Sequence, residues 1–262
     1  MYQKDSRIDS GRPFDWGRTS ADYARSRDIY PRVFYNKIAD RSLCVSGQNV
    51  LDIGTGTGVL ARNMYRFGAK WTGEDISFEQ IEQAKRLTAE ADMDITFRVA
   101  SAESTDHPPE TFDAVTACQC FWYFDHSRVV PVLAKIIKPG GRLIVLQMSW
   151  LPFEDEIAAM SEKLVLKYNP SWSGAGETRH PVYLPDIVFD YFDIEYREEY
   201  DLKVPFTRES WHDRMKTCRG IGASLTDNEI QAWEEEHKAM LASMAPERFE
   251  VSHYAAMAIL KP

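Results

Sequence analysis

The sequence predicts an α/β fold in which helices cover both faces of a doubly wound, mostly parallel sheet. Strand and helix patterns alternate strictly over about the first 150 residues, and parallel strands need crossover connections of this length. A buried strand pattern at 49–54 runs into the glycine-rich turn GTGTG and then into a helix pattern. Two alternating segments near the C-terminus are expected to form an antiparallel hairpin at one edge, which completes a seven-stranded sheet.

Apolar periodicity assigns the individual elements. The predicted strands are NVLDIG, KWTGEDI, ITFRVAS, FDAVTACQCFW, GRLIVLQMSW after the turn KPGG, YFDIEYREEYDL and FEVSHYAAMAIL. The predicted helices are 22–38, interrupted around Pro31, and then 58–68, 77–91, 126–137, 154–168 and 226–244. Capping boxes at Ser77/Gln80 and Thr226/Glu229 indicate where two of these helices begin.

The change of pattern after Trp150 divides the chain, although we expect one structural domain overall. Residues 1–45 are predicted to be a helical cover over the carboxyl end of the sheet, and 46–150 the core that holds the glycine turn. Residues 151–185 look like an inserted helical lid. Residues 186–262 supply the last strands of the sheet, with a helical substrate-recognition insertion at 206–245 that carries Ile230, Trp233 and Met240 on one stripe.

Composition favours a small-molecule partner. The net charge of -9 disfavours nucleic acid or an anionic membrane surface as the binding partner. The chain has neither a signal-peptide pattern nor an apolar stretch of membrane-spanning length, which predicts a cytoplasmic location. The cysteines, at 44, 118, 120 and 218, are expected to be reduced, and their spacing and that of the histidines predict no metal site. The oligomeric state stays open.

The glycine turn and an acid downstream of it predict a nucleoside site. Gly54, Gly56 and Gly58 permit a tight turn and close approach of a ligand to the backbone, beside the free N–H groups of a helix N-terminus. Asp75 follows about 20 residues later at the end of the next strand, where a carboxylate can accept hydrogen bonds from a ribose diol. The spacing is G-x-G-x-G rather than the dinucleotide G-x-G-x-x-G, and Asp52 adds negative charge. A cationic nucleoside cofactor fits this turn better than a pyrophosphate.

The motifs together resemble those of the class I S-adenosylmethionine-dependent methyltransferases, in the small-molecule branch similar to quinone-biosynthesis and trans-aconitate methyltransferases. They are VLDIGTGTG, TGEDIS, VASAE, FDAVTACQCFWYF and KPGGRLIV, and the resemblance covers about residues 23–145. It implies a Rossmann-like methyltransferase fold, S-adenosyl-L-methionine as the cofactor and S-adenosyl-L-homocysteine as its product.

The resemblance also implies roles in holding the methionine half of the cofactor. Asp52 and the turn at 54–56, which is Gly54, Thr55 and Gly56, match the segment that holds this half. Gln119 matches a position near the methionine amino group. Upstream, YARSRDIYP resembles the family's cover segment, which makes Tyr23 and Arg27 candidates and Arg27 the first choice for the methionine carboxylate.

For the adenosine half, the resemblance implies a second set of residues. Asp75 would bind the ribose hydroxyls, while Ile76 and Gln80 would flank the adenine. The backbone N–H of Ala102 would meet the adenine ring, with Glu103 beside it.

The methyl acceptor is less well determined. Methyl transfer from a sulfonium is an in-line displacement in which alignment supplies much of the rate, so the catalytic residue is left unknown. If a base is needed, the candidates are Tyr123, His126 and His180. Residues expected to contact the acceptor are Tyr30, Tyr123, Trp150, His180, Trp211, Arg214 and Arg219. The basic segment FTRESWHDRMKTCRG either grips an acceptor carboxylate or phosphate, or is an exposed helix face.

Two other classes stay open at this stage. A non-catalytic or regulatory nucleoside-binding protein would share the fold, and an NAD-dependent oxidoreductase would share the first strand, turn and acid. Titration with S-adenosylmethionine and with NAD distinguishes a methyltransferase from an oxidoreductase. Turnover to S-adenosylhomocysteine distinguishes it from a non-catalytic nucleoside-binding protein.

Overall fold

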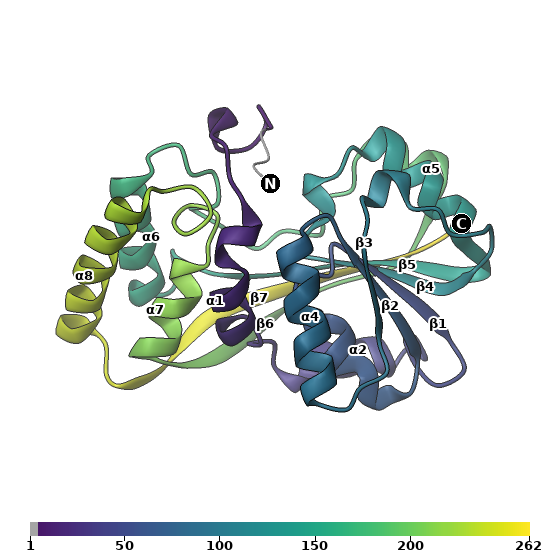
Figure 1. The fold of residues 1–262 in the computed structure, drawn as a ribbon, viewed down its shortest axis with the longest axis horizontal. Coiled ribbons are helices and arrows are strands. Elements are labelled where there is room, and N and C mark those ends of the chain that lie inside the picture. The colour runs from purple at the N-terminus through teal and green to yellow at the C-terminus, as the bar shows by residue number, and fades with distance from the viewer. Residues whose placement is uncertain (1–4) are drawn as a thin grey trace. The chain divides into compact units, whose positions relative to one another are not determined.

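The computed structural model describes residues 5–262, and these form a seven-stranded sheet in the order β3-β2-β1-β4-β5-β7-β6 (Figure 1). The strands are β1 Asn49–Ile53, β2 Lys70–Asp75, β3 Thr96–Val99, β4 Phe112–Cys118, β5 Ile137–Trp150, β6 Asp193–Thr207 and β7 Arg248–Lys261. Each of the seven predicted segments contains a strand, although β4 ends at Cys118 rather than at Trp122, and the predicted fold class is confirmed.

The first five strands are parallel, because their pairs β3–β2, β2–β1, β1–β4 and β4–β5 all run in the same direction. β6 and β7 form the antiparallel edge. Asp52 of β1 stands in register with Gly73 of β2 on one side and Thr116 of β4 on the other. This register brings the carboxyl ends of β1, β2 and β4 to the same edge, where a doubly wound sheet binds its ligand.

The helices follow the predicted alternation. They are α1 Ser20–Ser26, α2 Arg32–Ala39, α3 Val59–Met64, α4 Phe78–Glu90, α5 His126–Ile136, α6 Glu156–Tyr168, α7 Arg208–Lys216 and α8 Asp227–Met244. The helix predicted at 22–38 is divided into α1 and α2, because Pro31 is extended and stands at the start of α2. α3 ends in a short 3-10 turn closed by Gly68, as the pattern indicated.

Three local details differ from the sequence-based expectations or add to them. Ser77 caps α4 but the reciprocal bond from Gln80 is not formed, whereas the box at Thr226 is complete. On α8 the predicted stripe is buried at Trp233 and half-buried at Ile230 and Met240, and His237 and Leu241 of the same face are buried as well. β5 already begins at Ile137, so KPGG lies inside an irregular start of the strand rather than in a separate turn.

One apolar cluster fixes the helix that follows the second strand. Phe97 of β3 packs with Ile81 and Ala84 of α4. A Cβ on Gly58 or Gly73 would come within 2.8 or 2.7 Å of the Phe97 ring. Both glycines are therefore needed to admit this ring, and the ring in turn holds α4 against β2 and β3.

The chain contacts divide the protein into two compact units. Unit 1 comprises 1–29, 149–179 and 201–254, and unit 2 comprises 30–148, 180–200 and 255–262. The boundaries predicted at 45, 150 and 185, and the covering role of the first segment, stay predictions; residues 1–4 of that segment lie outside the described residues.

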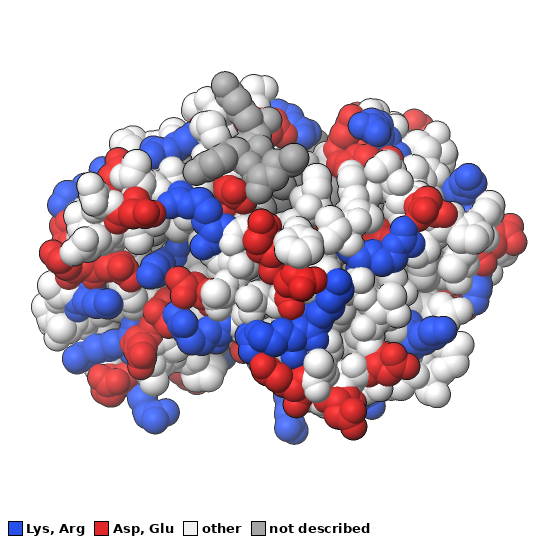
Figure 2. All heavy atoms as spheres, in the orientation of Figure 1, with Lys and Arg blue, Asp and Glu red and all other residues white. Residues whose placement is uncertain are grey.

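The surface and the helices bear on the expected partners. Lys and Arg side chains are interspersed with Asp and Glu over the face drawn in Figure 2, so this face is mixed in charge rather than uniformly basic. Within residues 5–262, each helix is too short or too polar to cross a membrane.

Candidate cofactor site

The glycine turn after β1 lies in unit 2 and has the backbone geometry that the sequence predicted. Gly54, Gly56 and Gly58 have φ of +61°, +57° and +74°, in the left-handed region that favours glycine. A Cβ on Gly54 would also lie 2.7 Å from Cβ and 2.8 Å from Sγ of Cys120. The close neighbour that excludes a side chain at Gly54 is thus part of the protein itself.

Asp52 is a buried carboxylate beneath this turn. It is 2% exposed, and its oxygens accept one hydrogen bond each from the hydroxyls of Thr55 and Thr116, both at 2.6 Å. Burial raises the pKa of Asp52 to about 6, although the two hydroxyl bonds oppose the shift. Each oxygen thus accepts one protein hydrogen bond, and the carboxylate places a negative charge beneath the turn when it is ionised. Thr116 was missed by the sequence analysis because only the β1–β4 register brings it to Asp52.

Asp75 joins the glycine turn to the start of α4. Its Oδ2 accepts a 2.9 Å hydrogen bond from the Gly56 N–H, and its Oδ1 accepts a 2.8 Å bond from the Ser77 N–H. Burial raises the pKa of the Asp75 carboxyl, against the effect of these backbone bonds. A carboxylate held from two sides in this way is preorganised to accept further hydrogen bonds from a ligand.

The predicted adenine segment is tied to the same strand end. The Ala100 N–H donates to the Asp75 carbonyl at 3.0 Å, and a single 3-10 turn follows at Ala102–Ser104. Glu103 accepts the Asp125 N–H at 3.0 Å and the Ser101 hydroxyl. Glu103 therefore holds the segment against the start of α5, in addition to any contact with a ligand.

Three further cofactor candidates differ in exposure. Ile76 is 52% exposed, whereas Gln80 is buried in the first turn of α4. Gln119 ends β4 with φ +65°, a strained conformation for a residue with a side chain, and its N–H donates to the Leu146 carbonyl at 2.9 Å. Its side-chain amide donates to the Met148 carbonyl.

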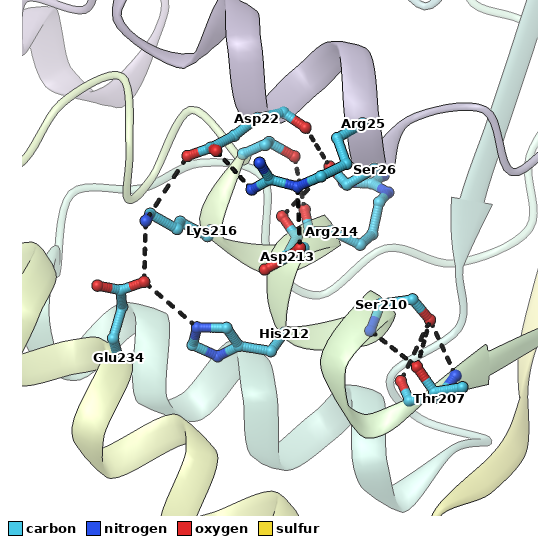
Figure 3. Close-up of polar contacts among 11 residues, drawn as sticks. Asp22, Arg25, Ser26, Thr207, Ser210, His212, Asp213, Arg214, Lys216 and Glu234 are labelled. Atoms are coloured by element: carbon cyan, nitrogen blue, oxygen red, sulfur yellow. Dashed lines mark hydrogen bonds and ion pairs between the residues drawn. The ribbon is translucent and has the colours of Figure 1, made fainter.

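Tyr23 and Arg27 belong to unit 1, whereas the glycine turn belongs to unit 2. The Arg27 guanidinium stands 4.6 Å from the centre of the Tyr23 ring and donates to the side chain and the carbonyl of Thr217 at 2.9 and 3.0 Å. The neighbouring Arg25 pairs with Asp22 at 2.6 Å (Figure 3). The proposed contact of Arg27 with a methionine carboxylate stays a prediction.

Part of the predicted acceptor set meets in unit 1. Trp150 and Trp211 pack edge to face at 5.7 Å, and the Arg214 guanidinium lies 4.8 Å from the Trp150 ring. Two successive residues of α6 accept the indole N–H groups, Ser161 from Trp211 at 2.9 Å and Glu162 from Trp150 at 2.6 Å. Trp211 is fully buried, so it supports Trp150 rather than offering a surface to an acceptor.

The basic segment around α7 is neither an exposed helix face nor one cluster. Arg214 and Arg219 are 6% and 9% exposed. Three of the cations have separate partners: Arg208 donates to the Ala245 carbonyl at 2.6 Å, Lys216 pairs with Glu234 at 2.9 Å and Arg219 pairs with Asp9 at 2.6 Å. Figure 3 shows the Lys216–Glu234 pair continuing to the buried ring of His212. These pairs form only where distant segments meet, which the sequence pattern did not reveal.

The remaining candidates belong to unit 2. Tyr30 stacks on Phe34 at 4.7 Å, and Tyr123 closes a 3-10 turn at Phe121–Tyr123. His126 contacts the Phe121 carbonyl at 3.0 Å, while half-buried His180 contacts the Pro181 carbonyl at 2.7 Å. Nothing in these contacts selects one of them as a base.

All four cysteines are free, as expected. Burial raises the pKa values of Cys44, Cys118 and Cys120, which makes these thiols poor nucleophiles. Within the described part of the chain, no group of three or more His, Cys, Asp or Glu side chains is placed to hold a metal ion.

A parallel sheet with a left-handed glycine turn and two acids at its carboxyl edge is the arrangement expected of a nucleoside-binding α/β protein. Comparison with known families agrees, since residues 51–145 match the model described as a methyltransferase domain. Over this stretch the chain is similar to methyltransferases of the class whose cofactor is S-adenosylmethionine, in agreement with the resemblance of its sequence motifs.

Among curated proteins, the chain is similar to the ubiquinone biosynthesis O-methyltransferase of Dechloromonas aromatica (strain RCB). The two are 28% identical over 158 residues, which is 59% of this chain and 67% of that protein. Other relatives of the same name are matched over 54% of their length. The chain thus spans between half and two thirds of these relatives.

Solved structures show the same fold. The YcgJ protein of Bacillus subtilis aligns with a TM-score of 0.54 and 19% identity, over 88% of this chain and 100% of that chain. A phosphoethanolamine N-methyltransferase 2 of Haemonchus contortus, in complex with phosphomonomethylethanolamine and S-adenosylhomocysteine, aligns with a TM-score of 0.55 and 18% identity. That match covers 98% of this chain and 58% of the other.

Proposed function

We propose that this protein transfers the methyl group of S-adenosylmethionine, by in-line displacement, to an O, N or C atom of a small-molecule acceptor. The observation that carries the proposal is the pair of acids at one sheet edge, Asp52 beneath the glycine turn and Asp75 bonded to that turn. An adenosyl sulfonium presents a ribose diol and a positive charge. Asp75 is placed to bind the ribose diol, and Asp52 to stabilise the positive charge.

The site also argues against a pyrophosphate cofactor. The Asp52 carboxyl is buried and has a pKa of about 6, so it is mostly ionised at neutral pH. A pyrophosphate placed at this turn would face that charge, whereas a cation would be stabilised by it. S-adenosylmethionine supplies an activated methyl group with a thioether as leaving group, and the chain's own residues would bind, orient and shield it.

Acceptor recognition is assigned to unit 1, where Trp150 lies against Arg214. The name of the similar O-methyltransferases favours a hydroxyl acceptor, which would lose its proton to Tyr123, His126 or His180. We propose a cytoplasmic enzyme that acts without nucleic acid.

Calorimetric titration tests the cofactor assignment. Wild-type protein should bind S-adenosylmethionine and S-adenosylhomocysteine but not NAD. Asp75→Ala should weaken both by about 1–3 kcal/mol, or roughly 5- to 150-fold, because charged hydrogen bonds to the ribose are lost. Asp190→Ala, which removes an exposed carboxylate of the same unit, should change neither affinity. Tight NAD binding, or equal affinities for Asp75→Ala and wild type, would refute the assignment.

A further inference from the structure

A second acid of β2 is buried beside Asp75. The side chain of Glu74 is 1% exposed, and its Oε1 lies 2.8 Å from Nε2 of His107. Its Oε2 is buried and has no hydrogen-bond partner in the part of the chain that the structure describes. Because side chains alternate along a strand, Glu74 points to the opposite face of the sheet from Asp75. The ribose contact proposed for Asp75 therefore leaves Glu74 unexplained.

His107 belongs to the loop that contains the predicted adenine segment. This loop follows β3, begins at Ala100, whose N–H donates to the Asp75 carbonyl of β2, and passes through the turn at Ala102–Ser104. Beyond that turn, the His107 ring packs edge to face on Phe112 at 4.7 Å, which orients it toward Glu74. The loop is thus fastened to β2 on both sides of the adenine segment, by backbone at Ala100 and by side chain at His107.

The backbone of Glu74 also holds the glycine turn. Its carbonyl accepts the Thr55 N–H at 2.9 Å, next to the bond from Gly56 to Asp75. Consequently one residue connects the turn that faces the ribose with the loop that faces the adenine. A shift of Glu74 would move both walls of the nucleoside pocket.

A buried carboxylate is a costly way to join two segments. Its desolvation is compensated only in part, since one oxygen lacks a partner, and two well-packed apolar side chains are often as stable or more stable than a buried charged pair. Arg98, the cross-strand neighbour of Glu74, is 3.5 Å away but bonds to exposed Asp106. Stability alone therefore gives no reason to keep Glu74 and His107, whereas geometry does.

We propose that Glu74 and His107 are positioning residues for the adenosine half of the cofactor. This proposal rests on the proposed function. Their hydrogen bond sets the spacing between the Asp75 carboxylate and the Ala102 N–H, which the ribose and the adenine would meet together. Neither side chain touches the cofactor in this scheme.

A double-mutant cycle separates this role from a structural one. The variants are Glu74→Leu, His107→Leu and their combination, titrated with S-adenosylhomocysteine and with 5′-methylthioadenosine, which has the adenosine half alone. Each single variant should raise both dissociation constants about tenfold, and the double variant should do no more. The double variant should nevertheless melt at or above the wild-type temperature. Hydrogen exchange over residues 100–107 should be faster in all three.

Two further variants serve as controls. His107→Gln keeps an N–H donor and should recover most of the affinity that His107→Leu loses, and it tests the proposal if a leucine variant fails to fold. Arg98→Gln removes the guanidinium near Glu74 and should change affinity less than twofold. Wild-type affinity in the folded double variant, or in the His107→Leu variant, would overturn the positioning role. A wild-type chain that binds neither compound would overturn the proposed function and this role with it.

Discussion

Lowering the pH through about 6 is expected to weaken binding of S-adenosylmethionine more than binding of S-adenosylhomocysteine, because Asp52 takes up a proton in that range. The two compounds differ in the positive charge on sulfur, and Asp52 supplies the negative charge that we assign to it. Burial, which disfavours the ionised form, raises the pKa of Asp52 from 3.8 to about 6.

The magnitude follows from that shift. A rise of about two units corresponds to roughly 3 kcal/mol spent on ionising Asp52 in the folded protein. The folded pKa lies above the unfolded one, so ionisation of Asp52 lowers the free energy of unfolding. The contribution of this group to stability is fully present below pH 4 and is lost as the pH rises through about 6. A sulfonium bound near Asp52 lowers the cost of ionising this carboxyl. Between pH 7 and pH 5 the affinity for S-adenosylmethionine should therefore fall about tenfold relative to that for S-adenosylhomocysteine.

Calorimetry at constant ionic strength from pH 5 to pH 8 measures this ratio. The raised pKa of Asp75 affects both compounds alike, since both carry the ribose, so it cancels in the ratio. Asp52→Asn can still form hydrogen bonds with Thr55 and Thr116 but carries no charge. In this variant the ratio of the two affinities should not vary with pH. A constant ratio in the wild type, or a ratio that still changes in Asp52→Asn, would refute the electrostatic role.

Two further predictions concern the glycine turn and the N-terminal segment. Gly54→Ala should abolish cofactor binding or unfold the domain, since the new Cβ would lie 2.7 Å from Cβ of Cys120. The control Gly47→Ala is also at positive φ but has no atom within 4 Å of its new Cβ, so it should lower the free energy of unfolding, measured by urea denaturation, by only about 1 kcal/mol. Equal losses for the two variants would disprove the clash. Asp9→Asn should lower the free energy of unfolding by about 3 kcal/mol at pH 7, because it leaves buried Arg219 without its carboxylate, and a loss under 0.5 kcal/mol would contradict this reasoning.

The Asp9 pair also has a defined pH dependence. Burial opposes ionisation of Asp9, but hydrogen bonds from Arg219 and Ser173 outweigh it and hold the pKa below 3.8. Its contribution is therefore present above about pH 4 and is lost as the pH falls through the folded pKa.

Local patterns were enough for the fold class. The strands and most helices lie where periodicity placed them, and Asp75 ends the second strand as expected, whereas its hydrogen bond with Gly56 was not predicted. On α8 the apolar spacing found the face that packs inward, but it did not reveal that His237 is buried there, because a polar residue does not mark an apolar stripe.

The sequence by itself determined what depends on neighbours along the chain: the glycines at positive φ, the caps at Ser77 and Thr226, and the order of strand and helix. Only the tertiary structure decided that Thr116 bonds Asp52 and that His107 meets Glu74. The physical reason is that burial and pairing arise where strands lie in register and loops return to them, and a pKa follows from those surroundings rather than from the residue type.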